Sequence, residues 1–415
     1  MNTSKQNGLF SPIALGTTHL KHRVVMAPLT RSRSVQPEGI PGDLMLEYYT
    51  QRTSDGGLII AEAAQLSVAT RGWHGAPGMY TDGQVEGWKR IVDGVHSKGG
   101  RMFAQLWHPG RFSHISLTGG AAPVSASVDP EYWENPSRLI STPHGWIQPS
   151  PHRAIETSEI PCVLELYSGA VKHARAAVFD GVEVHAGNGY FIDQFLQDGS
   201  NKRTDEYGGP IENRTRLLFE VVDAMVSAWS GDHVAVRITP GGTFNAMTDS
   251  DPEALHSHIA QGLTRFGLAY LHFIEPRMSG SMVIRNNQPP IVTQRARSIY
   301  KKKSWRTVGS NQVPPLTPLK KAKLTQYHSG GILFQILICQ DGCEKNFRLQ
   351  PTTATRFTLL RQRDTQIIRS TTEQPESESP MLLVPESIAM PVRDCVSELG
   401  NIWRTAGRNM PNLLG

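Results

Sequence analysis

Short apolar runs recur along the first 300 residues, and they are continuous rather than alternating with polar positions. Continuous runs rich in Val, Ile and Leu are typical of strands that are buried on both faces of a parallel sheet. The pattern predicts strands over residues 24–29, 57–62, 101–107, 181–185, 234–238 and 269–274.

Between these runs, apolar residues return at the spacing of a helix, over 86–98, 163–179 and 216–229. Alternating strands and helices indicate right-handed βαβ units, in either an open doubly wound sheet or a closed barrel. An open sheet of the Rossmann type predicts G-x-G-x-x-G after the first strand. The chain has neither this motif nor a P-loop, so the favoured fold is an α/β TIM (β/α)8 barrel.

The charge of the chain is unevenly distributed. The 415 residues include 42 Lys and Arg against 37 Asp and Glu, a formal net charge of +5. Residues 1–300 hold 26 basic and 28 acidic residues, whereas residues 301–415 hold 16 and 9. The basic excess therefore lies in the last 115 residues, where it is scattered among few aromatic residues, so no nucleic-acid partner is expected.

Several further classes are disfavoured by composition. No apolar run approaches the ~20 residues that span a bilayer, and the N-terminal MNTSKQNGLF has no apolar signal segment. Four cysteines suggest a reducing compartment rather than a disulfide scaffold. Cys339 and Cys343 lack the two further ligands of a zinc site. We expect a cytoplasmic protein with no membrane segment and no metal.

Polar residues stand where the predicted strands end, which is where TIM barrels carry their chemistry. His185, Asn188 and Tyr190 lie within six residues, separated by glycines that permit a tight backbone path. The imidazole and the amide can donate hydrogen bonds to one oxygen, while the phenol can give a proton. Other candidates at strand ends are Thr30, Arg31, Glu62, Gln105, Trp107, His108, Arg237 and Glu275.

One connection, residues 108–159, is unusually long and rich in Pro, Gly and Ser. A loop of this length after a barrel strand can cover an active site. A decorative insertion is the alternative, and the residues alone leave it open.

The run HAGNGYFIDQFLQDGSNKRTDEYGGPIENRTRLLFEVVDAM resembles the Old Yellow Enzyme family of FMN-dependent ene-reductases. MAPLTRSRS, EYYTQR, AQLWHPGR and LAYLHFIEPR stand in the order of that family. The stretch GWHGAPGMYTDGQVEGWKRIVDGVHSKGGR looks most like the branch of N-ethylmaleimide, nitrate-ester and 12-oxophytodienoate reductases. The resemblance covers about residues 8–295.

The resemblance implies an FMN across the barrel mouth, reduced by NADPH or NADH. Arg237 would supply positive charge for the anionic reduced flavin, and the Thr30 hydroxyl would bind a ring carbonyl. Taken singly, Arg237 would more often be an ion-pair partner, and Glu62 and Glu275 are expected to be structural partners of barrel arginines. The full set expected to bind the cofactor is Pro28, Leu29, Thr30, Ala63, Gln105 and Arg237.

The substrate implied by the resemblance is a small activated alkene, such as an enone or maleimide, or a nitro compound. His185 and Asn188 would bind its oxygen, the flavin would deliver hydride, and Tyr190 would protonate the neighbouring carbon. Trp107 would line the pocket. A single His after a strand is more often structural, and His185 departs from that expectation because Asn188 and Tyr190 accompany it. The expected oligomeric state is a monomer or weak homodimer.

The tail departs from the family pattern. A family barrel needs two more strands after Ile274, then a glycine-rich segment and a Gly-Arg pair that grip the FMN phosphate, and the chain after Ile291 lacks this pattern. Residues 330–338 are apolar enough for one strand, and 370–380 have a composition typical of disorder. The predicted division is an FMN-binding barrel over 1–300 and a divergent basic tail over 301–415.

Two interpretations of this break remain. The tail is either a divergent replacement domain or, as we favour, the product of an altered reading frame or splice after about Ile299. In either case a six-stranded fragment would have open edges. The alternative function is therefore an impaired or inactive family remnant that binds FMN weakly.

Overall fold

The central sheet holds its parallel strands in the order in which they occur along the chain. The computed structural model describes residues 10–274, 278–279, 282–283, 291–307 and 338–339. The strands, in sheet order, are β3 (Val25–Met26), β4 (Leu58–Gln65), β5 (Arg101–Trp107), β10 (Gly181–His185), β11 (Val234–Ile238), β12 (Tyr270–Ile274), β15 (Ser304–Thr307) and β16 (Ile338–Cys339). Consecutive order is the topology of a barrel, whereas a doubly wound sheet would reverse direction at its first strand.

All six strands expected from the apolar runs are present, and so are the three expected helices. Their apolar positions return every three or four residues and pack on the sheet, as in α2, where Thr81 and Gln84 form a capping box at the first turn. The main helices are α1 (Asp43–Arg52), α2 (Asp82–His96), α4 (Ile160–Ala176), α7 (Arg216–Ala228), α8 (Pro252–Leu263) and α9 (Ile291–Ile299), and shorter ones are α3 (Pro130–Glu134), α5 (Phe191–Leu196) and α6 (Ile211–Arg214).

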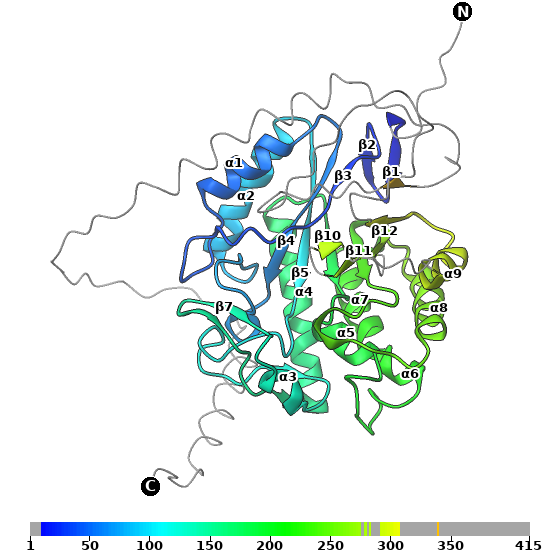
Figure 1. The fold of residues 1–415 in the computed structure, drawn as a ribbon. Helices are drawn as coiled ribbons and strands as arrows, with labels where there is room; N and C mark the ends of the chain where they lie inside the picture. The colour runs from blue at the N-terminus through cyan, green and yellow to red at the C-terminus, as the bar shows by residue number, and fades with distance from the viewer. Residues whose placement is uncertain (1–9, 275–277, 280–281, 284–290, 308–337, 340–415) are drawn as a thin grey trace, which may run out of the picture. The chain divides into compact units, whose positions relative to one another are not determined.

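Smaller elements lie at the two ends of the sheet. Hairpin β1–β2 and the strands of the long 108–159 connection lie at opposite ends in Figure 1. The two-stranded sheets are β1 (Ile13–Leu15) with β2 (Thr18–Leu20), β6 (Val124–Ser125) with β9 (Arg153–Ala154), β7 (Ile140–Thr142) with β8 (Gly145–Ile147), and β13 (Met278–Ser279) with β14 (Met282–Val283). Single 3-10 turns occur at Val68–Thr70, Thr157–Glu159, Gly231–His233, Phe244–Ala246 and Thr264–Phe266.

The sheet is curled, because side chains from strands that are not neighbours meet on its inner face. The rings of Phe103 on β5 and Tyr270 on β12 lie 5.5 Å apart, although β10 and β11 separate these strands. Tyr270 stacks on Trp305 of β15 at 3.7 Å. Leu15 and Leu20 of the β1–β2 hairpin belong to the same buried cluster. The inner face is therefore a packed barrel core, closed at one end by the hairpin.

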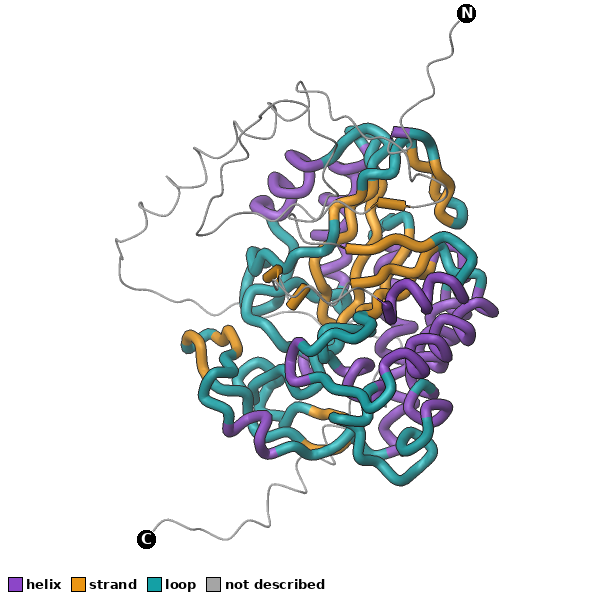
Figure 2. Tube along the Cα trace, turned by 45° about the vertical axis from the view of Figure 1, so that its right-hand side comes forward, coloured by secondary structure: helices purple, strands orange, loops and turns teal. Residues whose placement is uncertain are grey.

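The outer face of the sheet is covered by helices. The alternate residues of the strands, such as Val184 and Val236, join one large apolar cluster with the inward faces of α2, α4 and α7. Figures 1 and 2 show the helices around the outside of the curled strands, with long loops gathered at one end. Burial on both faces explains why the strands are continuously apolar in sequence.

The sequence expectation of a six-stranded fragment was wrong, because the described sheet has two further strands, β15 and β16. Residues 304–307, assigned from sequence to the tail, form β15, which pairs in parallel with β12 (Leu271 opposite Ser304). Trp305 fills the barrel core, so a tryptophan replaces the aliphatic residues that would have marked a strand. The next strand, β16, runs antiparallel to β15. It overlaps the end of the apolar run 330–338.

The described residues all belong to one compact unit, which spans 1–315 and 321–343. Within them, no helix combines the length and the apolar character that crossing a membrane requires. The segment predicted to be disordered, 370–380, lies outside the described residues. Of the chain after Ile291, expected to lack a phosphate-binding Gly-Arg pair, the structure describes 291–307 and 338–339.

Candidate active site

Polar side chains form a layer inside the barrel above its apolar core. Gln105, Glu183, Arg237 and His272 come from four neighbouring strands, and all four are buried. Strand register places them together, because Glu183 pairs with Gln105 and Arg237 pairs with His272. Gln105, Arg237 and His272 lie two residues beyond the core residues Phe103, Ala235 and Tyr270, and side chains of alternate strand residues share a face.

Glu183 is the centre of this layer. Its Oε1 accepts a hydrogen bond from Gln105 Nε2 at 2.7 Å, and its Oε2 lies 2.9 Å from His272 Nδ1. Burial opposes ionisation, but the charges of His272 and Arg237 and these hydrogen bonds outweigh it, so the pKa of Glu183 lies below its ordinary value. The carboxylate thereby compensates Arg237, whose own pKa is lowered by burial and supported by Glu183.

The backbone after β10 holds the predicted catalytic residues in a tight turn. Asn188 has a left-handed conformation with φ of 58°, which asparagine tolerates better than most residues. Gly189 also has positive φ, and a Cβ there would lie 2.8 Å from the Phe244 carbonyl oxygen. A Cβ on Gly187 would lie 2.2 Å from Thr239 Oγ1. The glycines are therefore required by close approach to the loop after β11.

The loop after β11 also orients Asn188. The Asn188 N–H donates to Thr239 Oγ1 at 3.0 Å, and the same hydroxyl lies 3.3 Å from Asn188 Oδ1. Asn245 Nδ2 donates to the Asn188 carbonyl oxygen at 2.9 Å. The backbone of Asn188 is thus held by Thr239 and Asn245, and its side-chain amide oxygen accepts from Thr239, at the carboxyl ends of the strands.

His185 is buried at the end of β10, opposite Arg237 in the strand register. Burial, together with the positive charge of Arg237, lowers the pKa of His185 well below its ordinary value. The ring is therefore neutral at pH 7, and it can act on a ligand as a hydrogen-bond donor rather than as a full charge.

Tyr190 is surrounded by aromatic rings. Its ring meets His185 and Trp107 edge-on, with centroids 5.0 Å away in each case, and Phe112 at 5.7 Å. Burial raises the pKa of Tyr190 above its ordinary value. The phenol therefore stays protonated through the physiological range, as a proton donor must.

The long 108–159 connection covers this cluster. Phe112, Leu117 and Ile140 from the connection pack with Trp107 and Ala63, and Tyr190 packs against them. The connection therefore packs over Tyr190, as expected for a loop that covers a site rather than for a decorative insertion. Phe112 was not predicted from sequence, because a loop aromatic has no periodic pattern to mark its face.

Trp73, after β4, was also missed. It stacks on Phe112 with centroids 5.7 Å apart and meets Trp146 of β8 edge-on at 5.3 Å. Glu183 and His272 were missed too, although each is the polar residue inside an apolar strand run. Glu183 lies two positions before His185 and therefore on the same face of the strand. This spacing could have identified Glu183 as a site residue from the sequence.

The loop after β3 carries the residues expected to lie along the flavin. Pro28 is buried, Leu29 is half-buried and Thr30 is exposed. Just beyond them, the Arg31 N–H donates to Glu62 Oε2 at 2.9 Å. Glu62 thus contacts Arg31 through the backbone and not through the guanidinium, so the expected pairing with a barrel arginine stays a prediction. Glu275 lies outside the described residues.

Glu62 is fully buried at an irregularity of β4, beside Ala63. Tyr49 donates to its Oε1 at 3.1 Å and accepts from the Glu62 N–H at 2.8 Å. Burial raises the pKa of Glu62 to about 7, against the hydrogen bonds from Arg31 and Tyr49. Glu62 thus joins α1, β4 and the loop that carries Thr30.

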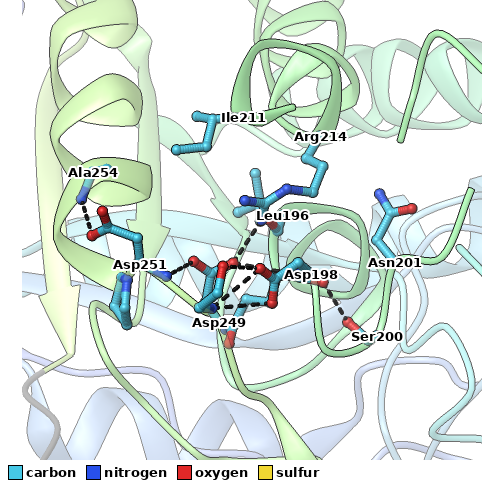
Figure 3. Close-up of polar contacts among 12 residues, drawn as sticks. Leu196, Asp198, Ser200, Asn201, Ile211, Arg214, Asp249, Asp251 and Ala254 are labelled. Atoms are coloured by element: carbon cyan, nitrogen blue, oxygen red, sulfur yellow. Dashed lines mark hydrogen bonds and ion pairs between the residues drawn. The ribbon is translucent and has the colours of Figure 1, made fainter. Parts of the chain in front are cut away.

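A second polar network ties the loops after β10 and β11 together (Figure 3). Arg214 Nη1 lies 2.6 Å from Asp249 Oδ2 and also donates to the Leu196 carbonyl oxygen. The Asp198 N–H donates to the same Asp249 oxygen at 3.0 Å, and Ser250 donates back to Asp198. Both loops contribute to the mouth of the barrel, so this network gives the site a rigid support.

Three buried donors at this mouth have no hydrogen-bond partner among the described residues: His185 Nδ1, Arg237 Nε and Trp107 Nε1. Buried polar groups without partners are uncommon in proteins and require an explanation. Donors from three strands, with the small residue Ala63 packed beside Trp107, fit an oxygen- and nitrogen-rich planar cofactor. Among the residues described, no cluster of His, Cys, Asp and Glu could hold a metal ion.

The sequence pattern of the NADH:flavin oxidoreductase / NADH oxidase family matches residues 8–318 of this chain. The chain belongs to this family. The match extends beyond residue 295, so the family pattern continues through β15. The resemblance to the Old Yellow Enzyme family and the predicted enzyme class, an FMN-dependent NAD(P)H:flavin oxidoreductase, are thereby confirmed.

Curated members of the family show the same similarity. A putative 12-oxophytodienoate reductase of Oryza sativa subsp. japonica is 45% identical over 276 residues, covering 65% of this chain and 72% of the relative. A flavin oxidoreductase of Emericella nidulans is 42% identical over 276 residues, covering 65% of this chain and 70% of the relative.

Solved structures of the family confirm the TIM-barrel fold. Morphinone reductase in complex with tetrahydroNAD is 43% identical, with a TM-score of 0.66 over 72% of this chain and 80% of its own. An Old Yellow Enzyme homologue from Zymomonas mobilis is 39% identical, with a TM-score of 0.67 over 72% and 81%.

Proposed function

We propose that this chain reduces activated carbon–carbon double bonds, such as those of enones, maleimides and nitro-olefins, with FMN as cofactor and NADPH or NADH as reductant. The observation that carries the proposal is the grouping of neutral His185, oriented Asn188 and protonated Tyr190 at one end of the barrel. His185 and Asn188 supply two hydrogen-bond donors for the substrate oxygen, and Tyr190 supplies a proton for the α-carbon.

We infer that FMN is held by the residues that the family resemblance implies: Pro28, Leu29, Thr30, Ala63, Gln105 and Arg237. The unpartnered Arg237 Nε supports this assignment, because a buried donor needs an acceptor. When bound, FMN supplies the hydride that it has received from the nicotinamide. The side chains of the protein bind and polarise the substrate and donate the proton.

His185 and Asn188 bind the carbonyl or nitro oxygen of the substrate and draw electron density toward it. Hydrogen bonds to this oxygen strengthen as negative charge develops there, so they stabilise the transition state more than the ground state. Because His185 is neutral, it does not protonate the oxygen outright. The α-carbon therefore becomes strongly basic.

Tyr190 donates its phenolic proton to that α-carbon and is reprotonated from solvent. Its raised pKa makes it a weak acid, which is sufficient for a carbon with carbanion character. Trp107, Phe112 and Trp73 exclude water from the reacting atoms and give the pocket flat apolar walls.

The test is a pair of anaerobic half-reactions on the purified chain. NADPH or NADH should bleach the flavin absorbance near its long-wavelength maximum, and an added enone should restore it with stoichiometric formation of the saturated ketone. Bleaching without reoxidation by any enone, maleimide or nitro-olefin would refute the substrate assignment.

A second candidate is an impaired family member that retains FMN weakly, and the direction of β16 favours it. In a complete barrel the eighth strand is parallel, and the loops after strands seven and eight commonly bind phosphate. An antiparallel strand beside β15 brings its amino end, not its carboxyl end, to the mouth. Gel filtration followed by measurement of flavin per chain separates the candidates, since tight stoichiometric FMN contradicts the second.

A further inference from the structure

A cavity of ≈ 310 Å³ lies beside the aromatic cluster, and of its lining residues only Trp73 also belongs to the proposed walls of the substrate pocket. Its walls come from Gln36, Pro37 and Gly39, from the end of β4 and the segment after it, and from Leu117 and Pro143 of the long connection. Trp73 and Leu117 line this cavity and also pack in the cluster that contains Trp107. The cavity therefore borders the proposed substrate pocket, with Trp73 between them.

The cavity contains a guanidinium group without an acidic partner. Arg71 lies in its wall, half-buried, and no Asp or Glu is among the lining residues. Arg71 Nε and one terminal nitrogen donate to the Tyr80 hydroxyl at 3.0 and 2.7 Å. In the part of the chain that the structure describes, Arg71 forms no ion pair. The guanidinium nitrogen that does not reach Tyr80 is available to an anion, because a guanidinium offers five N–H donors.

The backbone of Arg71 is fixed on both sides. Its N–H donates to the Val68 carbonyl oxygen at 3.2 Å. Its own carbonyl oxygen accepts a hydrogen bond from Ser113 Oγ, in the residue next to Phe112. Arg71 is thus anchored to the same connection that covers Tyr190, and the side chain is positioned before any ligand arrives.

We propose that this Arg71 cavity is a subsite for the carboxylate of a substrate side chain. The proposal rests on the proposed function: the activated double bond lies at Tyr190, an apolar chain passes Trp73 and Leu117, and the carboxylate meets Arg71. The remaining walls suit this occupant, since Pro37 and Ala76 contact hydrocarbon while Gln36 and His74 are polar. A guanidinium binds a carboxylate by paired charge-assisted hydrogen bonds.

The experiment compares ω-(3-oxocyclohex-1-enyl)alkanoic acids, with chains of four, six and eight carbons, against their methyl esters. The wild-type holoenzyme should prefer the acid at the chain length that reaches Arg71, by about 10- to 100-fold in kcat/KM, as for a charged hydrogen bond. Arg71→Met should abolish the preference and leave ester turnover within about twofold. Arg71→Lys should restore part of it.

Two control variants separate charge from structure. Tyr80→Phe removes the hydrogen bonds that Arg71 makes but keeps its charge, so most of the preference should remain. Arg90→Met removes one positive charge from the exposed face of α2, where Arg90 pairs with Asp43, and should change nothing. A preference that survives in Arg71→Met, or is missing at every chain length, overturns the proposal.

Two further outcomes are distinguishable. If Arg71→Met weakens flavin reduction by NADPH but not by NADH, the anion is the phosphate of the reductant, and the substrate subsite is wrong. If neither acid nor ester is reduced, the proposed function has failed, and the subsite is tested by binding. Octanoate but not octanol should then quench tryptophan fluorescence in the wild type and not in Arg71→Met, and equal quenching contradicts the subsite.

Discussion

Glu183 and Gln105 are hydrogen-bonded across the neighbouring strands β10 and β5, with Oε1 of the carboxylate 2.7 Å from the amide nitrogen. Both side chains are buried inside the barrel. Because the Gln105 nitrogen is engaged by Glu183, the amide oxygen is left to accept from a ligand. Glu183, for which the sequence predicted no role, thus orients Gln105, which was predicted to bind the cofactor.

The first prediction concerns the charge of Glu183. Glu183→Gln removes a negative charge beside Arg237, so the anionic reduced flavin becomes easier to form. We expect the midpoint potential of bound FMN to rise by tens of millivolts, where about 30 mV corresponds to ~1.4 kcal/mol for two electrons. A dye-linked reductive titration measures it. Glu220→Gln on α7, which accepts from Tyr207, is the control and should leave the potential unchanged.

The second prediction separates the two half-reactions at Tyr190. Tyr190→Phe keeps the aromatic packing against Trp107 and His185 but removes the proton. Alkene reduction should slow by about 100-fold or more, the usual range of general acid catalysis. Flavin reduction by NADPH should stay within about twofold in stopped-flow measurements. Equal loss in both half-reactions would contradict the proton-donor role.

The third prediction uses the buried carboxyl group of Glu62. Its pKa is about 7 in the folded chain, against an ordinary 4.5. Between these values the folded state holds more protons than the unfolded state, so stability falls as pH rises from about 4.5 to about 7. The loss attributable to Glu62 is about 3 kcal/mol.

Glu62→Gln should remove that part of the pH dependence, as measured by urea unfolding at pH 5 and pH 8. Glu47→Gln, on the exposed side of α1, is the matched control and should preserve the wild-type slope. If the Glu62 variant shows the same decline as the wild type, the buried carboxyl is not its source.

The fourth prediction concerns the ion pair that supports the loops at the barrel mouth (Figure 3). Arg214 and Asp249 are 2.6 Å apart, and their side chains are only 5% and 1% exposed. Asp249→Ala leaves Arg214 buried without its counter-charge, and we expect the free energy of unfolding to fall by about 3–5 kcal/mol. The double variant Arg214→Met/Asp249→Ala should lose less than the sum of the two single variants. Strict additivity would show that the pair is not coupled.

Much of the barrel could be predicted from the sequence, because burial on both faces makes parallel strands continuously apolar. All six predicted strands and three predicted helices occur where expected. Strand β15 was missed because its core position is Trp305, flanked by Ser304 and Arg306, and no apolar run marks it. The ends of the strands also pointed to His185, Asn188, Tyr190 and Arg237, whose roles stay predictions.

The partners of those residues could not be predicted. Glu183 and His272 are 89 residues apart in the chain and meet only because β10, β11 and β12 curl around one interior. The same curvature brings Phe103 and Tyr270 together across two intervening strands. Periodicity reports which face a residue occupies, and it carries no information on which distant residue shares that face.

The sequence by itself determined the strand–helix alternation, the residues at the strand ends and the family to which the chain belongs. Each of these features depends on residues that are close together in the chain, because burial patterns and motif spacings are properties of short segments. Only the tertiary structure decided that Glu183 orients Gln105, that the 108–159 connection covers Tyr190, and that Arg71 faces a cavity without a carboxylate. Those relationships depend on long-range packing, where side chains from separate strands and loops exclude water together.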